Sequence, residues 1–265
     1  MNQPMPIAAN DGRQKTYPSL GKCIYCGADK KLSREHIIPF GLGGNLVFTG
    51  ASCEQCAKAT SDFERYCLRN MFQAARTHLK LPTRNKKEKP KTLRLSYFRH
   101  EGTHEWLDVP VSDHPYAVVL PIFQPPTFIS GSPHQEGLVL EGTAILSGPG
   151  FFEKLQKFGS NKAFTQELSP DLFGRMLAKI AHGFAIAELG NNAFMPLLQG
   201  LIRGTEPFSS ACIGGGKELA RQGPLHQLSL DWRDSLLVCS IVLFSMEAPE
   251  AASAPTYEVI VGART

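Results

Sequence analysis

Two Cys-x2-Cys pairs constrain the fold of this chain more than any other feature. Cys23 and Cys26 form the first pair, Cys53 and Cys56 form the second, and residues 27–52 lie between them. This is the spacing of zinc ligands, and four thiolates close a tetrahedral shell that leaves no open position. A closed shell is typical of a structural site rather than a catalytic one. We therefore predict that these four cysteines bind a structural Zn²⁺ ion.

The other cysteines agree with a metal site rather than a disulfide framework. The chain has seven cysteines, an odd number, and Cys67, Cys212 and Cys239 each lie alone in an apolar or mixed segment, which favours core packing. No signal-like start precedes the module, and the longest apolar run, residues 236–244, is far below membrane-spanning length. We expect a cytoplasmic protein that has no membrane partner.

Composition and the positions of the proline-rich segments predict that the chain has four parts. The chain has 265 residues, 42% of them hydrophobic, which suffices for one large or two smaller domains. Residues 1–20 are polar and proline-rich, so we expect a flexible tail there. The basic, proline-containing segment 81–92 predicts a linker. It separates a zinc module at residues 21–80 from a larger domain at residues 93–265.

The larger domain alternates between strand and helix patterns. Residues 169–190 predict a helix that begins after the N-cap Ser169 and stops at Gly190, and we expect His182 on it to be a buried, hydrogen-bonded histidine. The module should end in an amphipathic helix over residues 61–81. Alternating apolar residues predict strands at 92–99, 103–111, 116–123, 137–148, 225–232, 236–244 and 257–262. We therefore expect an α+β domain.

An acid and an imidazole stand side by side between the two cysteine pairs. A single histidine is more often structural than catalytic, but Glu35 and His36 lie on a segment that the cysteine site would hold in place. Adjacent residues on an extended segment point to opposite sides, so one can reach a metal while the other faces a substrate. Pro39 prevents a helix here, and three glycines follow that let backbone or phosphate approach closely: Gly41, Gly43 and Gly44.

Together these motifs resemble a known family. The order C-x2-C, then E-H-I-I-P-x-G-L-G-G-N-L, then A-S-C-x2-C and a helix is similar to the HNH endonuclease family in its zinc-clipped form. The resemblance covers residues 21 to about 79. It implies a ββα-metal core inside a treble-clef-like finger. It also implies an enzyme that hydrolyses phosphodiester bonds in nucleic acid, with DNA as the expected substrate.

The resemblance also implies roles for three residues. His36 would be the general base that takes a proton from the attacking water, because an imidazole titrates near neutrality. Glu35 would hold a catalytic divalent ion, Mg²⁺ or Mn²⁺, as an oxygen ligand. Asn45 would hold the imidazole through a hydrogen bond, although a turn residue after two glycines explains Asn45 equally well.

One position departs from the family pattern. The family commonly has a His or Asn directly after the last zinc cysteine, as a second ligand of the catalytic metal, and this chain has Ala57 there. Ser61 and Glu64 share the face of Ala57 if the helix starts at the cysteine pair. A capping box formed by Ser61 and Glu64, with the helix starting at residue 61, is slightly favoured over ligation. The sequence leaves open whether Glu35 holds the metal with water and substrate oxygens or whether the site is weak or inactive.

Basic residues suggest how the module contacts nucleic acid. The net charge of +4 does not identify a nucleic-acid binder by itself. The residues that we expect to contact phosphate, besides the basic linker, are Arg34, Lys58, Arg65, Arg69 and Arg76. The alternatives to a nuclease are a non-catalytic zinc finger that binds nucleic acid, and a structural clip whose larger domain senses a ligand. That domain is also where we expect a second copy of the chain or an activating partner to bind.

Overall fold

The structure is a computed structural model. It describes residues 7–8, 13–84, 89–98, 103–133, 135–158, 163–164, 166–207, 210–216, 223–247 and 254–264. Among these residues, no helix is both long and apolar enough to cross a membrane.

The larger domain is built on an antiparallel sheet. Its strand order is β1-β12-β13-β14-β10, and β11 pairs with the other part of β14. Strands β13 and β14 are buried along almost their whole length because they lie at the centre of the sheet. The strands are β1 (Ile7–Ala8), β10 (Met195–Pro196), β11 (Ile213–Gly215), β12 (His226–Arg233), β13 (Leu236–Leu243) and β14 (Thr256–Ala263).

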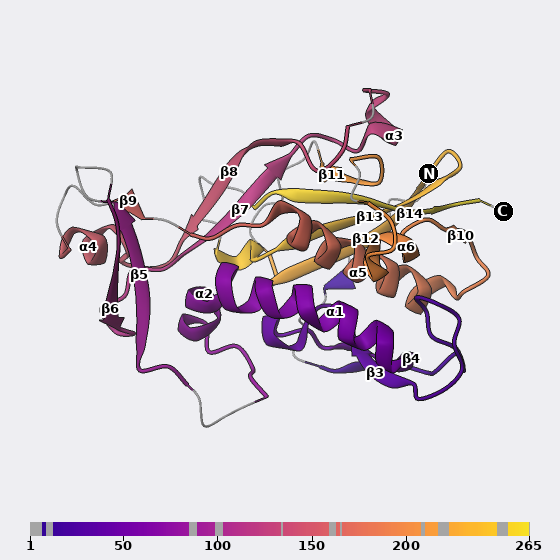
Figure 1. Ribbon diagram of the computed structural model, residues 1–265, viewed down its shortest axis with the longest axis horizontal. Helices are drawn as coiled ribbons and strands as arrows, with labels where there is room; N and C mark the ends of the chain where they lie inside the picture. The colour runs from indigo at the N-terminus through magenta and orange to yellow at the C-terminus, as the bar shows by residue number, and fades with distance from the viewer. Residues whose placement is uncertain are drawn as a thin grey trace.

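Helix α5 (Pro170–Leu189) is the central helix of the molecule and lies between this sheet and helix α1 of the module (Figure 1). The Oγ of Ser169 accepts a hydrogen bond from the backbone N–H of Leu172 at 3.4 Å, and Gly190 follows the last helical residue. The predicted helix with its N-cap and stop is therefore confirmed. Its position explains its composition, since a helix covered on two sides must be apolar around most of its circumference.

The module contains a small sheet and a bent helical segment. Its three-stranded sheet has the order β2-β4-β3, in which β2 and β4 are parallel and β3 and β4 antiparallel. The elements are β2 (Lys15–Tyr17), β3 (Ser33–His36), the 3₁₀ turn η1 (Phe40–Leu42), β4 (Leu46–Ser52), α1 (Glu54–Tyr66), the π-helical turn η2 (Cys67–Met71) and α2 (Gln73–His78).

Two sequence predictions about the module are wrong. Residues 15–17 are not part of a flexible tail, because they form β2 and Tyr17 is buried against the module. The helix does not start at residue 61, because α1 begins at Glu54 directly after Cys53. Ser61 lies inside α1 and its Oγ donates to the carbonyl of Lys58 at 2.9 Å, so it caps nothing.

The predicted amphipathic helix over residues 61–81 is divided in three. Its first part belongs to α1, η2 then adds a π-helical turn, and α2 follows after Phe72. Phe72 is fully buried at this break and packs on Phe173 of α5 and on Phe244, with ring centroids 6.1 and 5.1 Å away. The break turns the apolar face of the segment toward both partners.

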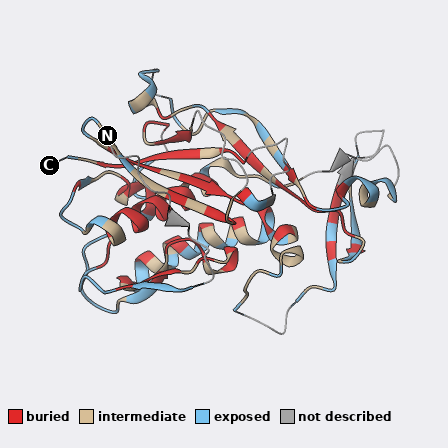
Figure 2. Cartoon of the chain, turned by 180° about the vertical axis from the view of Figure 1, so that it is seen from behind, coloured by how far each residue is buried: buried red, intermediate tan, exposed pale blue. Residues whose placement is uncertain are grey.

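Two hairpins and several short helices complete the fold. The strands β5, β6, β7 and β8 confirm the predicted strands between residues 92 and 148, whereas β9 was not predicted. The β5–β6 hairpin extends away from the main body as an arm that carries both exposed and buried residues (Figure 2). The elements are β5 (Thr92–Phe98), β6 (His104–Pro110), β7 (Ala117–Phe123), β8 (Leu140–Ser147), β9 (Ala163–Phe164), α3 (Thr127–Ser130), α4 (Phe151–Gln156), α6 (Gln199–Arg203) and the 3₁₀ turn η3 (Ser245–Glu247).

One hydrophobic cluster joins the module to the larger domain. Tyr25, Ile37 and Phe48 of the module belong to the same buried cluster as Phe173 and Tyr257. The chain is therefore a small module with a four-cysteine cluster packed on a larger α+β domain, as predicted for the fold class. The proposed linker stays a prediction, and its residues 85–88 lie outside the described part of the chain.

Candidate active site and metal centre

The four predicted zinc ligands converge. Their sulfur atoms all lie within 4.8 Å of one another, and the Sγ atoms of Cys26 and Cys53 are 3.6 Å apart. The first pair lies in a tight turn that Gly27 closes with a left-handed φ of 78°, which glycine adopts without strain. The second pair lies where β4 ends and α1 begins. The β3–β4 pairing thus brings the two ends of the motif together.

The electrostatics of this cluster favour a bound cation. Burial raises the pKa of the Cys53 thiol, but hydrogen bonds from the backbone N–H of Cys56 and from the neighbouring thiols outweigh it, so the pKa is lowered to about 7. Burial raises the pKa of Cys23. Four sulfurs this close cannot all ionise without a positive ion between them. The residues therefore fit a structural metal such as zinc.

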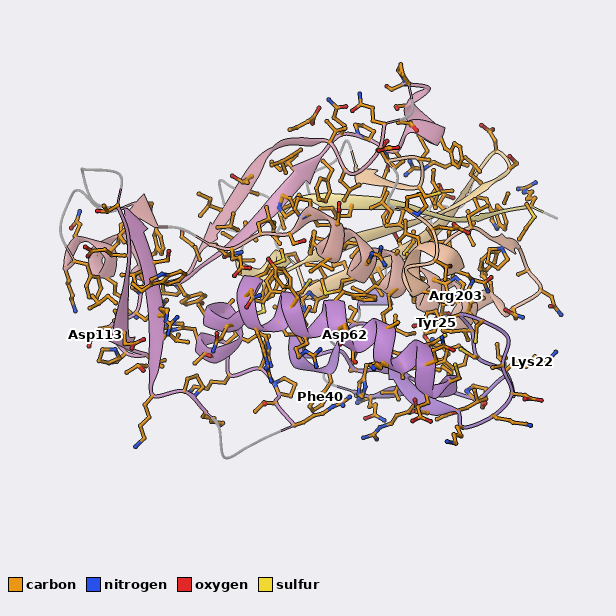
Figure 3. All side chains as sticks on the ribbon, in the orientation of Figure 1. Lys22, Tyr25, Phe40, Asp62, Asp113 and Arg203 are labelled. Atoms are coloured by element: carbon orange, nitrogen blue, oxygen red, sulfur yellow. The ribbon has the colours of Figure 1, made fainter. Side chains whose placement is uncertain are left out.

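Glu35 and His36 are separated as the sequence predicted for adjacent residues on a strand. They end β3, where the pairing with β4 is irregular between Ser33 and Glu35. Glu35 is buried, with 8% of its surface exposed, whereas His36 is partly exposed and its ring lies 5.2 Å from the ring of Phe40. Figure 3 places Phe40 below α1, on the side of the module away from the large sheet. The ring of His36 is therefore a neighbour of the Phe40 ring and is only partly covered.

The surroundings of His36 keep its imidazole neutral. Burial lowers the pKa of His36 below its usual 6.5, and the positive charges of Lys179, Arg34 and Arg84 lower it further. Glu35 opposes this shift without cancelling it. At neutral pH the ring is therefore deprotonated and able to accept a proton.

Glu35 points inward to a buried lysine that comes from the larger domain. The Nζ atom of Lys179, in the middle of α5, lies 2.7 Å from Oε1 of Glu35 and 2.7 Å from Oε1 of Glu64. The same ammonium donates to the backbone carbonyl of His36 and approaches that of Ile37 at 3.3 Å. Lys179 is fully buried. Three elements, β3, α1 and α5, therefore meet at one ammonium.

The residues here do not fit a resident divalent metal ion. The carboxylate expected to hold Mg²⁺ or Mn²⁺, that of Glu35, faces an ammonium instead, and so does the carboxylate of Glu64. Ala57 adds no ligand. Within the described residues, the four cysteines form the one group of three or more Cys, His, Asp or Glu side chains close enough to hold a metal ion.

Asn45 lies directly before β4, close to the strand that carries His36. The side-chain Nδ2 of Asn45 donates to the backbone carbonyl of Arg13 at 2.8 Å, and the backbone carbonyl of Asn45 accepts from the backbone N–H of Lys15 at 3.0 Å. These bonds attach the N-terminal segment to the module. The role of holding the imidazole of His36 stays a prediction.

The predicted phosphate-binding residues fall into two groups. Four of them are exposed: Arg34, Lys58, Arg65 and Arg69. Arg65 pairs with Asp62 one helical turn earlier. Arg76 differs, because its Nε donates to the carbonyl of Gly41 at 2.7 Å and its Nη1 to that of Leu68 at 2.9 Å. Burial lowers the pKa of Arg76. Its guanidinium joins the loop that contains Gly41, Gly43 and Gly44, called the glycine loop below, to the helical segment.

Two buried histidines of the larger domain also hold the module by its backbone. Nε2 of His182 donates to the carbonyl of Ile24 at 2.8 Å, which confirms the expected buried histidine. Nε2 of His226 donates to the carbonyl of Leu42 at 2.8 Å, and its Nδ1 accepts from the backbone N–H of Phe244 at 3.3 Å. Burial lowers the pKa of both histidines to about 4.

Neither Lys179 nor His226 was predicted from the sequence as a site residue, and Arg84 was predicted only as part of the basic linker. A lysine inside the apolar face of the helix at 170–189 was a visible signal, because a lysine is almost never fully buried without a partner. Its partners lie far away in sequence, so no spacing rule connects them. Arg84 belonged to the basic linker cluster, and only the fold brings it near His36.

Comparison with known proteins agrees with the motif. Residues 23–72 match a family model described as HNH endonuclease. The matched segment contains both cysteine pairs, Glu35, His36 and Glu64, but it ends before the larger domain and Lys179. No curated protein and no solved structure matches the chain.

Proposed function

We propose that this chain is a nuclease of the HNH type, which hydrolyses phosphodiester bonds in nucleic acid, with DNA as the proposed substrate. The observation that carries the proposal is His36: a neutral, partly exposed imidazole beside a glycine loop and within the matched segment. The four-cysteine metal site supports this role, since it holds the strand that bears His36 at fixed geometry.

In this proposal each residue has a separate task. The neutral His36 takes a proton from a water molecule, the water oxygen attacks phosphorus, and the bond to the leaving sugar oxygen breaks. The exposed guanidinium groups of Arg34 and Arg84 attract the phosphate, because both already act electrostatically on His36. Arg76 holds the glycine loop at Gly41.

The glycine loop supports a close backbone approach at one position. A Cβ atom on Gly44 would lie 2.0 Å from the backbone carbonyl oxygen of Ile38, so only glycine fits there. The turn that Gly44 permits brings the chain back to β4 directly after η1. The loop beside His36 is therefore tightly folded rather than an open insertion.

A second candidate function is a non-catalytic module that binds nucleic acid. The observation that favours it is the carboxylate pair of Glu35 and Glu64, which faces Lys179 instead of a divalent ion, together with Ala57. The exposed basic residues Lys58, Arg65 and Arg69 on α1 and η2 suit both functions.

Cellular context is part of the same proposal. The described cysteines form no disulfide bond, and a zinc-thiolate site persists in a reducing compartment, which supports a cytoplasmic location. We likewise propose that a second copy of the chain or an activating partner binds through the larger domain.

Incubation with supercoiled plasmid tests the function. The protein is prepared with one equivalent of Zn²⁺ in buffer freed of other metals, and is assayed with and without Mg²⁺, Mn²⁺ or a chelator. His36→Ala should abolish nicking and leave plasmid binding unchanged, while Gln73→Ala, an exposed position of the same module, should nick like the unaltered protein. Binding without nicking under every condition would favour the non-catalytic module.

A further inference from the structure

The environment of Lys179 is that of a bound cation. Its ammonium contacts four oxygen atoms, two from the carboxylates of Glu35 and Glu64 and two from the backbone carbonyls of His36 and Ile37. An all-oxygen shell of carboxylates and carbonyls is also what a hard divalent ion selects. The oxygen atoms are therefore arranged as in a metal site, but the ammonium of Lys179 lies where the metal ion would be.

The three charged side chains of this cluster are largely buried. The side chain of Lys179 is 1% exposed, and those of Glu35 and Glu64 are 10% and 19% exposed. Two carboxylates this deep in the protein repel each other unless a positive charge lies between them. Burial raises the pKa of Glu64, and the nearby charge of Lys179 acts in the opposite direction. The cluster thus needs a cation to stay ionised.

We infer that the ammonium of Lys179 is the resident cation of the Glu35–Glu64 carboxylate pair and occupies the position of a divalent metal ion. Beside His36 it supplies fixed positive charge that is part of the fold and that no chelator removes. The inference also predicts nicking without added Mg²⁺ or Mn²⁺, and this catalytic part rests on the proposed function. The identity of the cation does not depend on nicking.

The origin of Lys179 adds a positional consequence. The lysine belongs to α5 of the larger domain, whereas both carboxylates belong to the module. The charge of the module's site is therefore complete only when α5 is packed against it. A separated module would present two carboxylates without their cation.

Substitution of methionine for Lys179 tests the inference directly. Methionine fills most of the volume of the lysine stem but ends short of Nζ, so Lys179→Met leaves both carboxylates and vacates the ammonium position. Lys22→Met, at an exposed lysine beside the first cysteine pair, is the matched control. Zinc-loaded full-length proteins are titrated with Mn²⁺ and followed by electron paramagnetic resonance, and melting is recorded with and without the ion.

The expected result is that the unaltered protein and Lys22→Met bind no stoichiometric Mn²⁺, whereas Lys179→Met binds one ion per chain and melts higher with it. Adding Glu64→Gln to Lys179→Met should abolish that binding. A folded Lys179→Met protein that binds no Mn²⁺ would overturn the inference. So would one Mn²⁺ bound by the unaltered protein and lost in Glu35→Gln, a test that does not require Lys179→Met to fold. Failure of the proposed function appears separately, as absence of nicking.

Discussion

Nζ of Lys179 lies 2.7 Å from Oε1 of Glu35, and this ion pair joins the central helix of the larger domain to the strand that carries His36. Both partners are buried. The contact therefore connects the packing of the larger domain with the electrostatics of the candidate active site. Its removal should lower the stability of the fold as well as change the charge beside His36.

Lys179→Met should lower the free energy of unfolding by about 3–5 kcal/mol, because it leaves two buried carboxylates without a counter-charge. Urea unfolding at neutral pH measures the loss. Lys22→Met serves as the control and should change stability little, since Lys22 is exposed. Recovery of part of the loss in Lys179→Met with Glu64→Gln would identify the stranded charge as the cause, and equal stability of Lys179→Met and the unaltered protein would contradict the prediction.

The nicking rate should depend on the protonation of His36. Its pKa lies below 6.5, and a general base works only when neutral, so the rate should stay high at pH 6.5 and fall as the pH drops through the lowered pKa. Arg34→Ala removes one of the charges that lower this pKa and should move the acidic limb to higher pH. A rate profile with its midpoint above pH 6.5 would exclude His36 as the base.

Acid should destabilise the contact between the two parts through His182 and His226. Their pKa is about 4 in the folded protein and 6.5 when unfolded, so the unfolded chain binds more protons below pH 6.5. The stability present above pH 6.5 is lost as the pH falls toward 4, about 2 kcal/mol for each histidine between pH 7 and 5.

His226→Gln isolates one of these contributions. Glutamine can still donate to the carbonyl of Leu42 but does not titrate, so the variant should lose about 2 kcal/mol less than the unaltered protein between pH 7 and 5. Guanidinium unfolding at the two pH values measures the difference. Identical losses in both proteins would show that His226 does not contribute to the pH dependence.

Purified protein should contain one zinc ion per chain. Cys53→Ser should remove it and unfold the module, because small zinc modules derive roughly 10–16 kcal/mol of apparent binding energy from the metal. Metal analysis and far-ultraviolet circular dichroism measure the two effects. Cys212→Ser, which alters a cysteine outside the four-cysteine cluster, should keep the zinc; a chain that holds no zinc while fully folded would contradict the prediction.

Arg34 and Arg84 should contribute to nucleic-acid affinity through phosphate contacts. Replacement of either by alanine should weaken binding for all sequences alike and reduce the slope of log affinity against log salt by about 1. Fluorescence anisotropy with labelled duplex DNA at several salt concentrations measures both. Arg203→Ala, at an exposed arginine on α6, is the control and should leave the slope unchanged.

The local patterns of the sequence predicted the elements well. Ser169 and Gly190 bounded α5, the alternating segments became strands, and the two cysteine pairs converged on one cluster. These features depend on neighbours in the chain, whose geometry a spacing rule describes. The start of α1 was missed for the same kind of reason: Ser61 and Glu64 match a capping box, but the turn at Cys53 had already begun the helix.

By itself the sequence determined the four-cysteine site, the position of His36 between the pairs and the α+β character of the larger domain. Tertiary structure alone decided which charge meets Glu35, which histidines hold the backbone of the module, and that Tyr17 and Phe72 belong to a core shared with the larger domain. The physical reason is range. Capping and ligand spacing act over a few residues, whereas a buried ammonium is stabilised by whichever oxygens the packed helices bring to it, and that depends on the whole fold.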